Sequence, residues 1–338
     1  MAYIICFIIS ILLLLYLMAF EKKCNVNVVL LVIVVAIGNG GYYALSQAKN
    51  LEEAILANNI TYVLGLFAPL VLFIIVCDVC KVRLSRVVRL VLYCVQVFMY
   101  LMVCTIGTST IYYKTVDFYI DEAGPHLVKT YGIMHTVFWI ILMSYTFVGI
   151  GIAIYSLNRD TTVSRVNVES LLFVNILTVG VYIIERLTKV QFDLTPIFST
   201  FTILVMTFIA MKIYTYSILD NHDLQEEELK DNGYVFFNKE LKYMGCNRLA
   251  LDFFPEFETW ELEKKIPGNG GRFNTFLRQP LMSYTKEGGI EKSTAKTYQY
   301  KGEIYRYEIG TLIRNKRWVK GYYIKVSNVT DVVNQTNE

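Results

Sequence analysis

The chain has 338 residues, of which 54% are hydrophobic and 18% are charged, with a mean hydropathy of +0.42. Soluble domains are usually about 45–50% apolar and about 25% charged, so this composition argues against an ordinary soluble protein. The formal net charge is only +3 and no stripe of Lys and Arg alternates with aromatic residues, which excludes a typical nucleic-acid-binding protein. Charged residues are rare up to about residue 217 and frequent after it, which indicates two segments in two different solvents.

Seven apolar stretches are each long enough to cross a membrane as a helix. A helix rises about 1.5 Å per residue, so about 20 apolar residues span about 30 Å of hydrocarbon. Because lipid offers no water to backbone N–H and C=O groups, a spanning stretch must be helical. The first stretch lacks a basic start and a small-residue cleavage site, which favours a span over a signal peptide. The predicted spans are residues 2–20, 26–45, 60–77, 87–106, 131–155, 171–187 and 196–219.

The distribution of Lys and Arg predicts the orientation of these spans. Short cytoplasmic loops carry an excess of positive charge. With the N-terminus outside, eight basic residues fall in inner loops: Lys22, Lys23, Lys81, Arg83, Arg86, Arg89, Arg159 and Arg165. Five fall in outer loops: Lys49, Lys114, Lys129, Arg186 and Lys189. We therefore predict a multi-pass protein of the cell membrane with its N-terminus outside and its C-terminus in the cytoplasm.

The longest outer connection, residues 107–130, has the pattern of a β hairpin. Residues 109–121 are rich in β-branched and aromatic side chains, and Gly124-Pro125 supplies a turn signal. We expect an extracellular hairpin at about residues 108–130 that lies over the helix bundle. Such a hairpin is either a lid over a ligand or a loop that only covers the bundle. The side chains expected to be exposed are Tyr112, Tyr113, Lys114, Asp117, Phe118 and His126.

Three ionisable residues share a depth near the outer ends of the fifth and sixth spans. His135 lies about one turn into the fifth span, and Glu185 and Arg186 end the sixth. Charged groups inside a membrane usually face the bundle interior, so these three predict an outward-facing pocket beneath the hairpin. Arg186 snorkelling to the interface, Glu185 pairing with it, and a hydrogen-bonded core histidine are the alternatives. The candidate ligand-sensing residues are Tyr112, Tyr113, Lys114, His135, Glu185 and Arg186.

A charged connector, residues 220–232, leads into a segment with a different periodicity. The connector is either a short helical strap or a solvated linker. Residues 233–247 predict two short strands and then a helix capped at Asn247. Strand-like runs follow at residues 297–300, 304–312 and 321–326, so about 100 residues form one small core. Five aromatic residues either line a ligand pocket or simply fill this core: Phe236, Tyr243, Phe254, Trp260 and Phe276.

Residues 233–333 resemble a PAS domain. The likeness rests on a strand pair that runs into Gly-Cys-Asn247 and on the ending Asn328-Val-Thr-Asp331, which is similar to the family's D-[IV]-T-[DE] close. Asn328 stands where Asp is usual, at a junction that commonly passes signals onward. The seven spans, residues 1–219, resemble the N-terminal sensor region of bacterial histidine kinases and diguanylate cyclases. Tyr62-x-x-Gly65-x-x-x-Pro69 and Gly124-Pro125 carry that likeness.

The two resemblances together imply a signal-transduction receptor. The expected fold is an all-α seven-helix transmembrane bundle plus a cytoplasmic α+β PAS-like domain, an antiparallel sheet with flanking helices. An extracellular or membrane-borne stimulus would be relayed through the PAS domain to a kinase or diguanylate cyclase output, on the same chain or a separate one. The resemblance also implies a homodimer formed through the PAS domain and the linker. Membrane lipid is the other expected partner.

No catalytic or metal-binding motif is visible, so we expect no enzyme activity in this chain and no cofactor. Residues 334–338 are interpreted as a tail leading to an output module that is absent from this sequence. The main alternative is a small-solute transporter with a regulatory cytoplasmic domain. A second alternative is a membrane scaffold whose PAS domain only dimerises.

Overall fold

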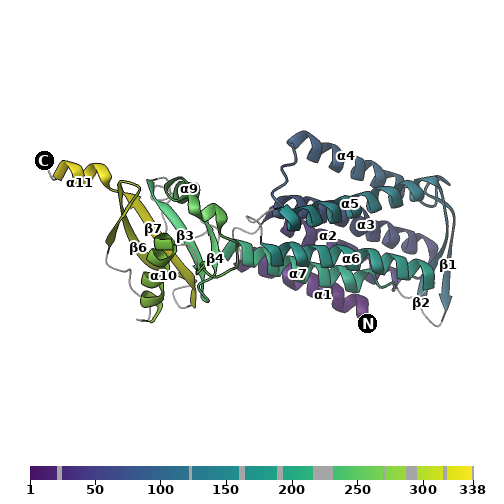
Figure 1. Ribbon diagram of the computed structural model, residues 1–338. Helices are drawn as coiled ribbons and strands as arrows, with labels where there is room; N and C mark the ends of the chain where they lie inside the picture. The colour runs from purple at the N-terminus through teal and green to yellow at the C-terminus, as the bar shows by residue number, and fades with distance from the viewer. Residues whose placement is uncertain are drawn as a thin grey trace. The chain divides into compact units, whose positions relative to one another are not determined.

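The computed structural model describes residues 1–20, 25–121, 124–159, 164–188, 193–215, 231–268, 271–286, 295–314 and 318–336. The chain divides into two compact units. The first comprises residues 1–159 and 165–211, and the second residues 160–164 and 212–338. Figure 1 shows that the first unit is built of long helices with one β hairpin, and that the second combines a sheet with shorter helices.

Helices in the first unit cover the core of every predicted span. They are α1 (Ala2–Phe20), α2 (Val26–Leu45), α3 (Leu51–Val79), α4 (Arg86–Val103), α5 (Ile133–Arg159), α6 (Arg165–Thr188) and α7 (Thr195–Thr215). α3 begins at Leu51 rather than at residue 60, because Asn50 caps it. The Asn50 side chain accepts a 2.9 Å hydrogen bond from the backbone N–H of Glu53, whose carboxylate accepts one of 2.9 Å from the backbone N–H of Lys49. This reciprocal capping extends the helix beyond its apolar part.

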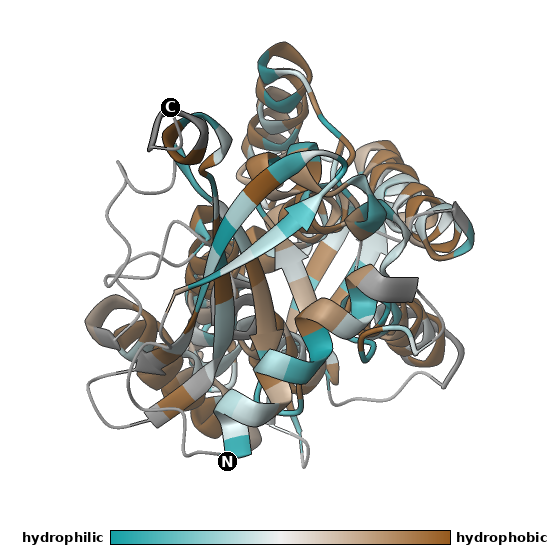
Figure 2. Cartoon of the chain, turned by 60° about the vertical axis from the view of Figure 1, so that its left-hand side comes forward, coloured by the Kyte–Doolittle hydropathy of each residue, from teal (hydrophilic) through white to brown (hydrophobic). Residues whose placement is uncertain are grey.

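Most of these helices have the length and composition of membrane spans. Among the described residues, α1 to α5 are long and apolar enough to cross a membrane, and α7 contains a shorter apolar stretch, Thr195–Ile209. Figure 2 colours the long helices mostly brown, for hydrophobic. α3 packs against α2, α4, α5 and α6. Its contact with α2 is close, because a Cβ on Gly41 would lie 2.7 Å from the backbone nitrogen of Thr61.

The predicted hairpin is present between α4 and α5. It consists of β1 (Tyr113–Asp121) and β2 (Gly124–Tyr131), which pair antiparallel with Tyr119 opposite His126. Figure 1 shows the hairpin lying across the end of the helix bundle at which α5 begins. Alternate side chains of a strand point to opposite faces, so one face of this hairpin meets the bundle and the other does not.

The second unit is an antiparallel five-stranded sheet with helices packed on one face. Its strands lie in the order β4-β3-β7-β6-β5. The elements are β3 (Gly233–Asn238), β4 (Tyr243–Cys246), α9 (Arg248–Phe253), the 3-10 helix η2 (Pro255–Thr259), α10 (Gly271–Lys286), β5 (Lys296–Tyr300), β6 (Glu303–Arg314), β7 (Trp318–Asn328) and α11 (Thr330–Thr336). Asn247 caps α9 as predicted, with its side chain accepting a 3.0 Å hydrogen bond from the backbone N–H of Ala250. The predicted antiparallel sheet is thereby confirmed, and the predicted linker lies mostly outside the described residues.

Candidate functional site

One close contact between the hairpin and the helix bundle lies at Gly132, between β2 and α5. The backbone N–H of Gly132 donates a 2.8 Å hydrogen bond to the carbonyl of Tyr112, and that of Met134 donates one of 3.1 Å to the carbonyl of Ile111. A Cβ on Gly132 would lie 2.3 Å from the Ile111 carbonyl oxygen. Only glycine allows the two backbones to approach this closely, so the hairpin has a defined position on α5.

Two tyrosines at the start of β1 form the contact between hairpin and bundle. Tyr112 and Tyr113 are 0% and 2% exposed, which corrects the expectation that both face the solvent. Their rings pack beside Tyr62 of α3, and the Tyr62 and Tyr113 hydroxyls are 2.6 Å apart in a hydrogen bond. Burial raises the pKa of both hairpin tyrosines, although Lys129 opposes the shift at Tyr113, so their hydroxyls stay protonated. The two tyrosines therefore anchor the hairpin to α3.

His135 lies in the first turn of α5, next to the hairpin. It is 8% exposed, and its ring stacks on the ring of Tyr131 with a centroid distance of 3.8 Å and an interplanar angle of 10°. Tyr112 meets the same ring edge-on at 5.8 Å, and Phe138 lies at 5.8 Å as well. This packing positions the imidazole by contacts from both the hairpin and α5.

A cavity of about 320 Å³ opens at this end of the bundle, and we call it the hairpin cavity. Five segments contribute to it: the end of α2, the first half of α3, β2, the start of α5, and the start of α7 together with Asp193 just before it. Its walls are aromatic and polar. The lining residues are Tyr42, Leu45, Asn58, Thr61, Tyr62, Gly65, Lys129, Tyr131, His135, Phe138, Trp139, Asp193 and Thr195. Small-molecule sites commonly have volumes of about 300–1,000 Å³, so a small ligand fits this space.

Two opposite charges face the hairpin cavity among its described lining residues. Lys129 donates a 2.7 Å hydrogen bond from its ammonium group to Oδ1 of Asn58, and the ammonium lies 5.7 Å from the centre of the Tyr113 ring. Asp193 lines the cavity, and the surrounding protein, by removing water from its carboxyl, raises the pKa of that group, while the charge of Lys129 lowers it in part. Asn58 is 1% exposed, and its amide nitrogen has no hydrogen-bond partner within the described ranges of the chain.

The sequence-based candidates meet this cavity only in part. His135 lines it. Tyr113 does not line it but contacts two residues that do, Tyr62 and Lys129. Lys114 is exposed on β1 and is absent from the lining. Glu185 and Arg186 belong to α6, but their side chains lie outside the described residues.

Sequence reasoning missed Asn58, Lys129, Tyr131 and Asp193 as site residues. One signal was available for two of them. Lys129 and Tyr131 are two residues apart on β2, so they lie on the same strand face. A polar residue inside an apolar helix also marks Asn58.

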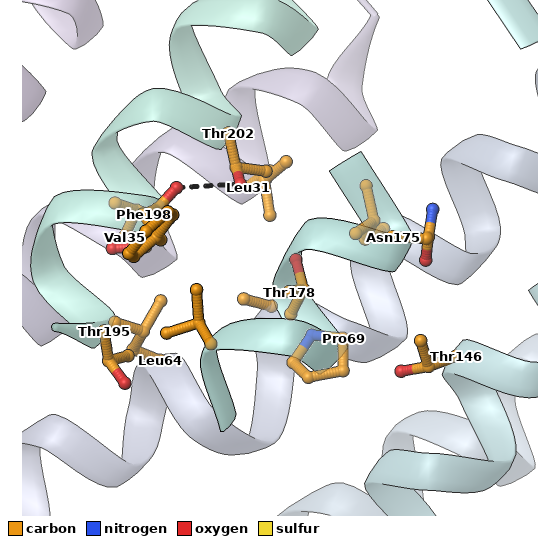
Figure 3. A pocket seen from close by; sticks show the side chains of 14 residues that line it. Leu31, Val35, Leu64, Pro69, Thr146, Asn175, Thr178, Thr195, Phe198 and Thr202 are labelled. Carbon is orange, nitrogen blue, oxygen red and sulfur yellow. Dashed lines mark hydrogen bonds between the residues drawn. The ribbon is translucent and has the colours of Figure 1, made fainter. Parts of the chain in front are cut away.

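A second cavity, the mid-bundle cavity, lies deeper among α2, α3, α5, α6 and α7 (Figure 3). Apolar side chains such as Leu31 and Val35 line it together with hydroxyl groups, and Pro69 of α3 borders it. A proline within a helix leaves the carbonyl four residues earlier, here that of Gly65, without its helical donor. Gly65 lines the hairpin cavity, and Thr195 lines both cavities. The two cavities therefore adjoin.

A buried polar cluster ties α7 to the first two helices. Asn39 is 0% exposed, and its amide donates hydrogen bonds of 2.9 Å to Ser10 of α1 and 2.9 Å to Thr200 of α7. Ser199, which lines the mid-bundle cavity, donates one of 3.4 Å to Oδ1 of Asn39. Polar contacts of this kind hold helices together in lipid.

The candidate pocket residues of the second unit are divided between two faces of its sheet. Tyr243, Phe254 and Trp260 belong to the buried core, with Phe276 packed against it. Phe254 is 0% exposed, and its ring centre lies 5.1 Å from that of Phe273 and 4.8 Å from that of Tyr305, also core residues. Phe236 lies on the opposite face in a separate cluster, because it is out of phase with its core-facing strand neighbours.

No group of three or more His, Cys, Asp and Glu side chains suited to a metal ion occurs in the described part of the chain.

A family model described as the N-terminal 7TM region of histidine kinase matches residues 2–221. A search of curated proteins gave no match. The apolar helices agree with the family's membrane location, and the family points to a membrane sensor of histidine kinases. This chain belongs to the family of histidine kinase N-terminal 7TM regions.

Proposed function

We propose that this chain is the input part of a signalling protein and that the hairpin cavity receives the stimulus. The observation that carries the proposal is the convergence of five segments on one cavity beneath a closely fitted hairpin. A ligand that contacts several helices at once stabilises one arrangement of the bundle over another. It shifts the equilibrium by its difference in affinity for the two arrangements.

The proposal includes seven membrane spans with the hairpin outside. The family model covers all seven helices, and α1 to α5 are apolar enough to span by themselves. Basic residues between α3 and the first turn of α4 support the orientation, because they lie at the opposite helix ends from the hairpin. They are Lys81, Arg83, Arg86 and Arg89. Short basic loops stay in the cytoplasm, so the hairpin end then faces outward and residues after α7 are cytoplasmic.

The second unit is proposed to act as a PAS-like relay. An antiparallel sheet with helices packed on one face is the arrangement that the resemblance implies. The relay would pass the signal to a kinase or diguanylate cyclase output, on the same or another chain, within a homodimer formed through this unit and the linker. Close packing of rings around Phe254 supports a structural core over a ligand pocket.

A small-solute transporter is the second candidate function, and one observation favours it. The hairpin cavity and the mid-bundle cavity adjoin at Thr195, which makes a partial path into the bundle. Flux of small solutes in proteoliposomes separates the two functions, because a receptor shows none.

The test of sensing uses the chain joined at its C-terminal end to a histidine kinase output domain. His135→Ala removes the stacked ring from the cavity wall, and we expect the autophosphorylation rate to change by at least about fivefold, a usual size for allosteric coupling. His126→Ala is the matched control, because His126 lies on the hairpin but not in the cavity lining. Equal rates for the two variants and the unchanged chain would contradict the proposal.

A further inference from the structure

We propose that the hairpin cavity binds a small zwitterion, with its carboxylate at Lys129 and Asn58 and its cationic amine at Asp193 among aromatic rings. This inference rests on the proposed function and names the class of ligand for the same cavity. Amino acids and betaines are the compounds of this class.

The two opposite charges of the cavity indicate a ligand that itself has both charges. Lys129 and Asp193 both line the cavity, and within the described part of the chain neither forms an ion pair with a residue of opposite charge. A cation alone would be attracted to Asp193 but repelled by Lys129, and an anion alone would meet the reverse. A ligand with both charges satisfies both residues.

The side chains around Lys129 indicate where the carboxylate of the ligand binds. The Lys129 ammonium group donates a 2.7 Å hydrogen bond to Oδ1 of Asn58, so the amide oxygen is engaged and the amide nitrogen of the same side chain remains as a donor. That nitrogen is buried and has no hydrogen-bond partner among the residues that the structure describes. A carboxylate accepts hydrogen bonds but donates none, so an ammonium and an adjacent amide nitrogen are suitable partners for it.

The aromatic rings of the cavity indicate where the cationic amine of the zwitterion binds. Tyr42, Tyr131 and Trp139 line the cavity that Asp193 borders. The faces of aromatic rings attract cations, and quaternary ammonium groups are commonly bound among such rings. The volume of about 320 Å³ favours a ligand of metabolite size over a peptide.

The experiment measures binding to the full chain in lipid nanodiscs by calorimetry. The probes are glycine, 4-aminobutyrate and glycine betaine as zwitterions, with acetate and tetramethylammonium as the single charges. We expect at least one zwitterion to bind at least tenfold more tightly than both single-charge probes. Lys129→Met and Asp193→Asn should each weaken that binding at least tenfold, and Lys129→Arg should retain most of it.

Two control variants lose the same charges from the exposed face of the hairpin. Lys114→Met and Asp117→Asn lie on β1 outside the cavity lining and should leave the affinity unchanged. Circular dichroism of every variant checks that its helices are intact. The inference is overturned if no zwitterion binds, if acetate or tetramethylammonium binds as tightly, or if the controls weaken binding equally.

The same compounds added to the kinase fusion separate this inference from the proposed function. Should His135→Ala change the kinase rate while no zwitterion binds, the ligand class is wrong and the sensing role stands. Zwitterion binding that depends on Lys129 and Asp193 but leaves the kinase rate unchanged supports the ligand class and contradicts the sensing role.

Discussion

Gly132→Ala tests whether the hairpin is anchored on α5 as the structure describes. The added Cβ would lie 2.3 Å from the Ile111 carbonyl oxygen and 2.8 Å from that of Thr110, and both atoms are backbone. The two chains must therefore move apart. The backbone conformation of Gly132 is an ordinary one for an L residue, since its φ is not positive, so the expected effect is steric.

The size of the effect follows from the contacts that are lost. Separation weakens the hydrogen bonds from Gly132 to Tyr112 and from Met134 to Ile111, each worth about 1 kcal/mol. Overpacking a closed contact costs about 1–3 kcal/mol. We expect the free energy of unfolding to fall by roughly 2–4 kcal/mol. Because the hairpin also supplies Lys129 and Tyr131, binding in the hairpin cavity should weaken as well.

Denaturant unfolding in detergent micelles, followed by circular dichroism, measures the change. Gly151→Ala is the control, because a Cβ at that position in α5 meets nothing within 4 Å. Alanine favours a helix over glycine by up to about 1 kcal/mol, so this control should be neutral or slightly stabilising. If Gly132→Ala is as stable as Gly151→Ala, the described anchoring of the hairpin is wrong.

Three further predictions concern other parts of the chain. Asn39→Leu removes the hydrogen bonds of Asn39 to α1 and α7. Because such bonds average about 0.6 kcal/mol each, the bundle should lose about 1–2 kcal/mol of stability in the same unfolding assay. An unchanged stability would show that the polar cluster does not stabilise the bundle. Phe254→Ala empties the core of the second unit and should cost about 3–5 kcal/mol, seen as rapid proteolysis of that unit, and a protease-resistant variant would contradict the described core. Burial raises the pKa of Glu256, but the Tyr300 hydroxyl and Lys301 lower it more, so the net pKa is below the ordinary 4.5. The folded state then binds fewer protons than the unfolded state, so stability should fall as the pH drops below about 4.5, and less so in Tyr300→Phe; identical pH profiles would refute this pairing.

The helices, the hairpin and the sheet were predictable because each has a strong local cause. Apolar length dictates a helix in lipid, and β-branched residues before Gly124-Pro125 favour a hairpin. The cap at Asn247 follows from its side chain alone. The early start of α3 was missed, because the capping by Asn50 and Glu53 lies outside the apolar stretch that was used to define the span.

The candidate site was less predictable, because its parts meet only in the folded bundle. An outer connection is expected to face solvent, and nothing local to Tyr112 and Tyr113 shows that they pack on Tyr62 of α3, so both were expected to be exposed. Asp193 reaches the cavity only through the position of α7. Phe236 was grouped with the core because neighbouring positions of β3 are also apolar, which hides the two-residue period.

The most direct test of the account asks whether filling the hairpin cavity from outside changes the signal. Thr61→Cys places a thiol in the cavity wall, and Thr115→Cys places one on the exposed part of the hairpin, each in a kinase fusion whose seven native cysteines are alanine. A membrane-impermeant thiol reagent is added to intact cells. The account predicts that both sites are labelled and that only labelling at residue 61 changes the autophosphorylation rate, by at least about fivefold. Labelling at residue 61 without any change in rate, or an equal change from residue 115, would contradict it.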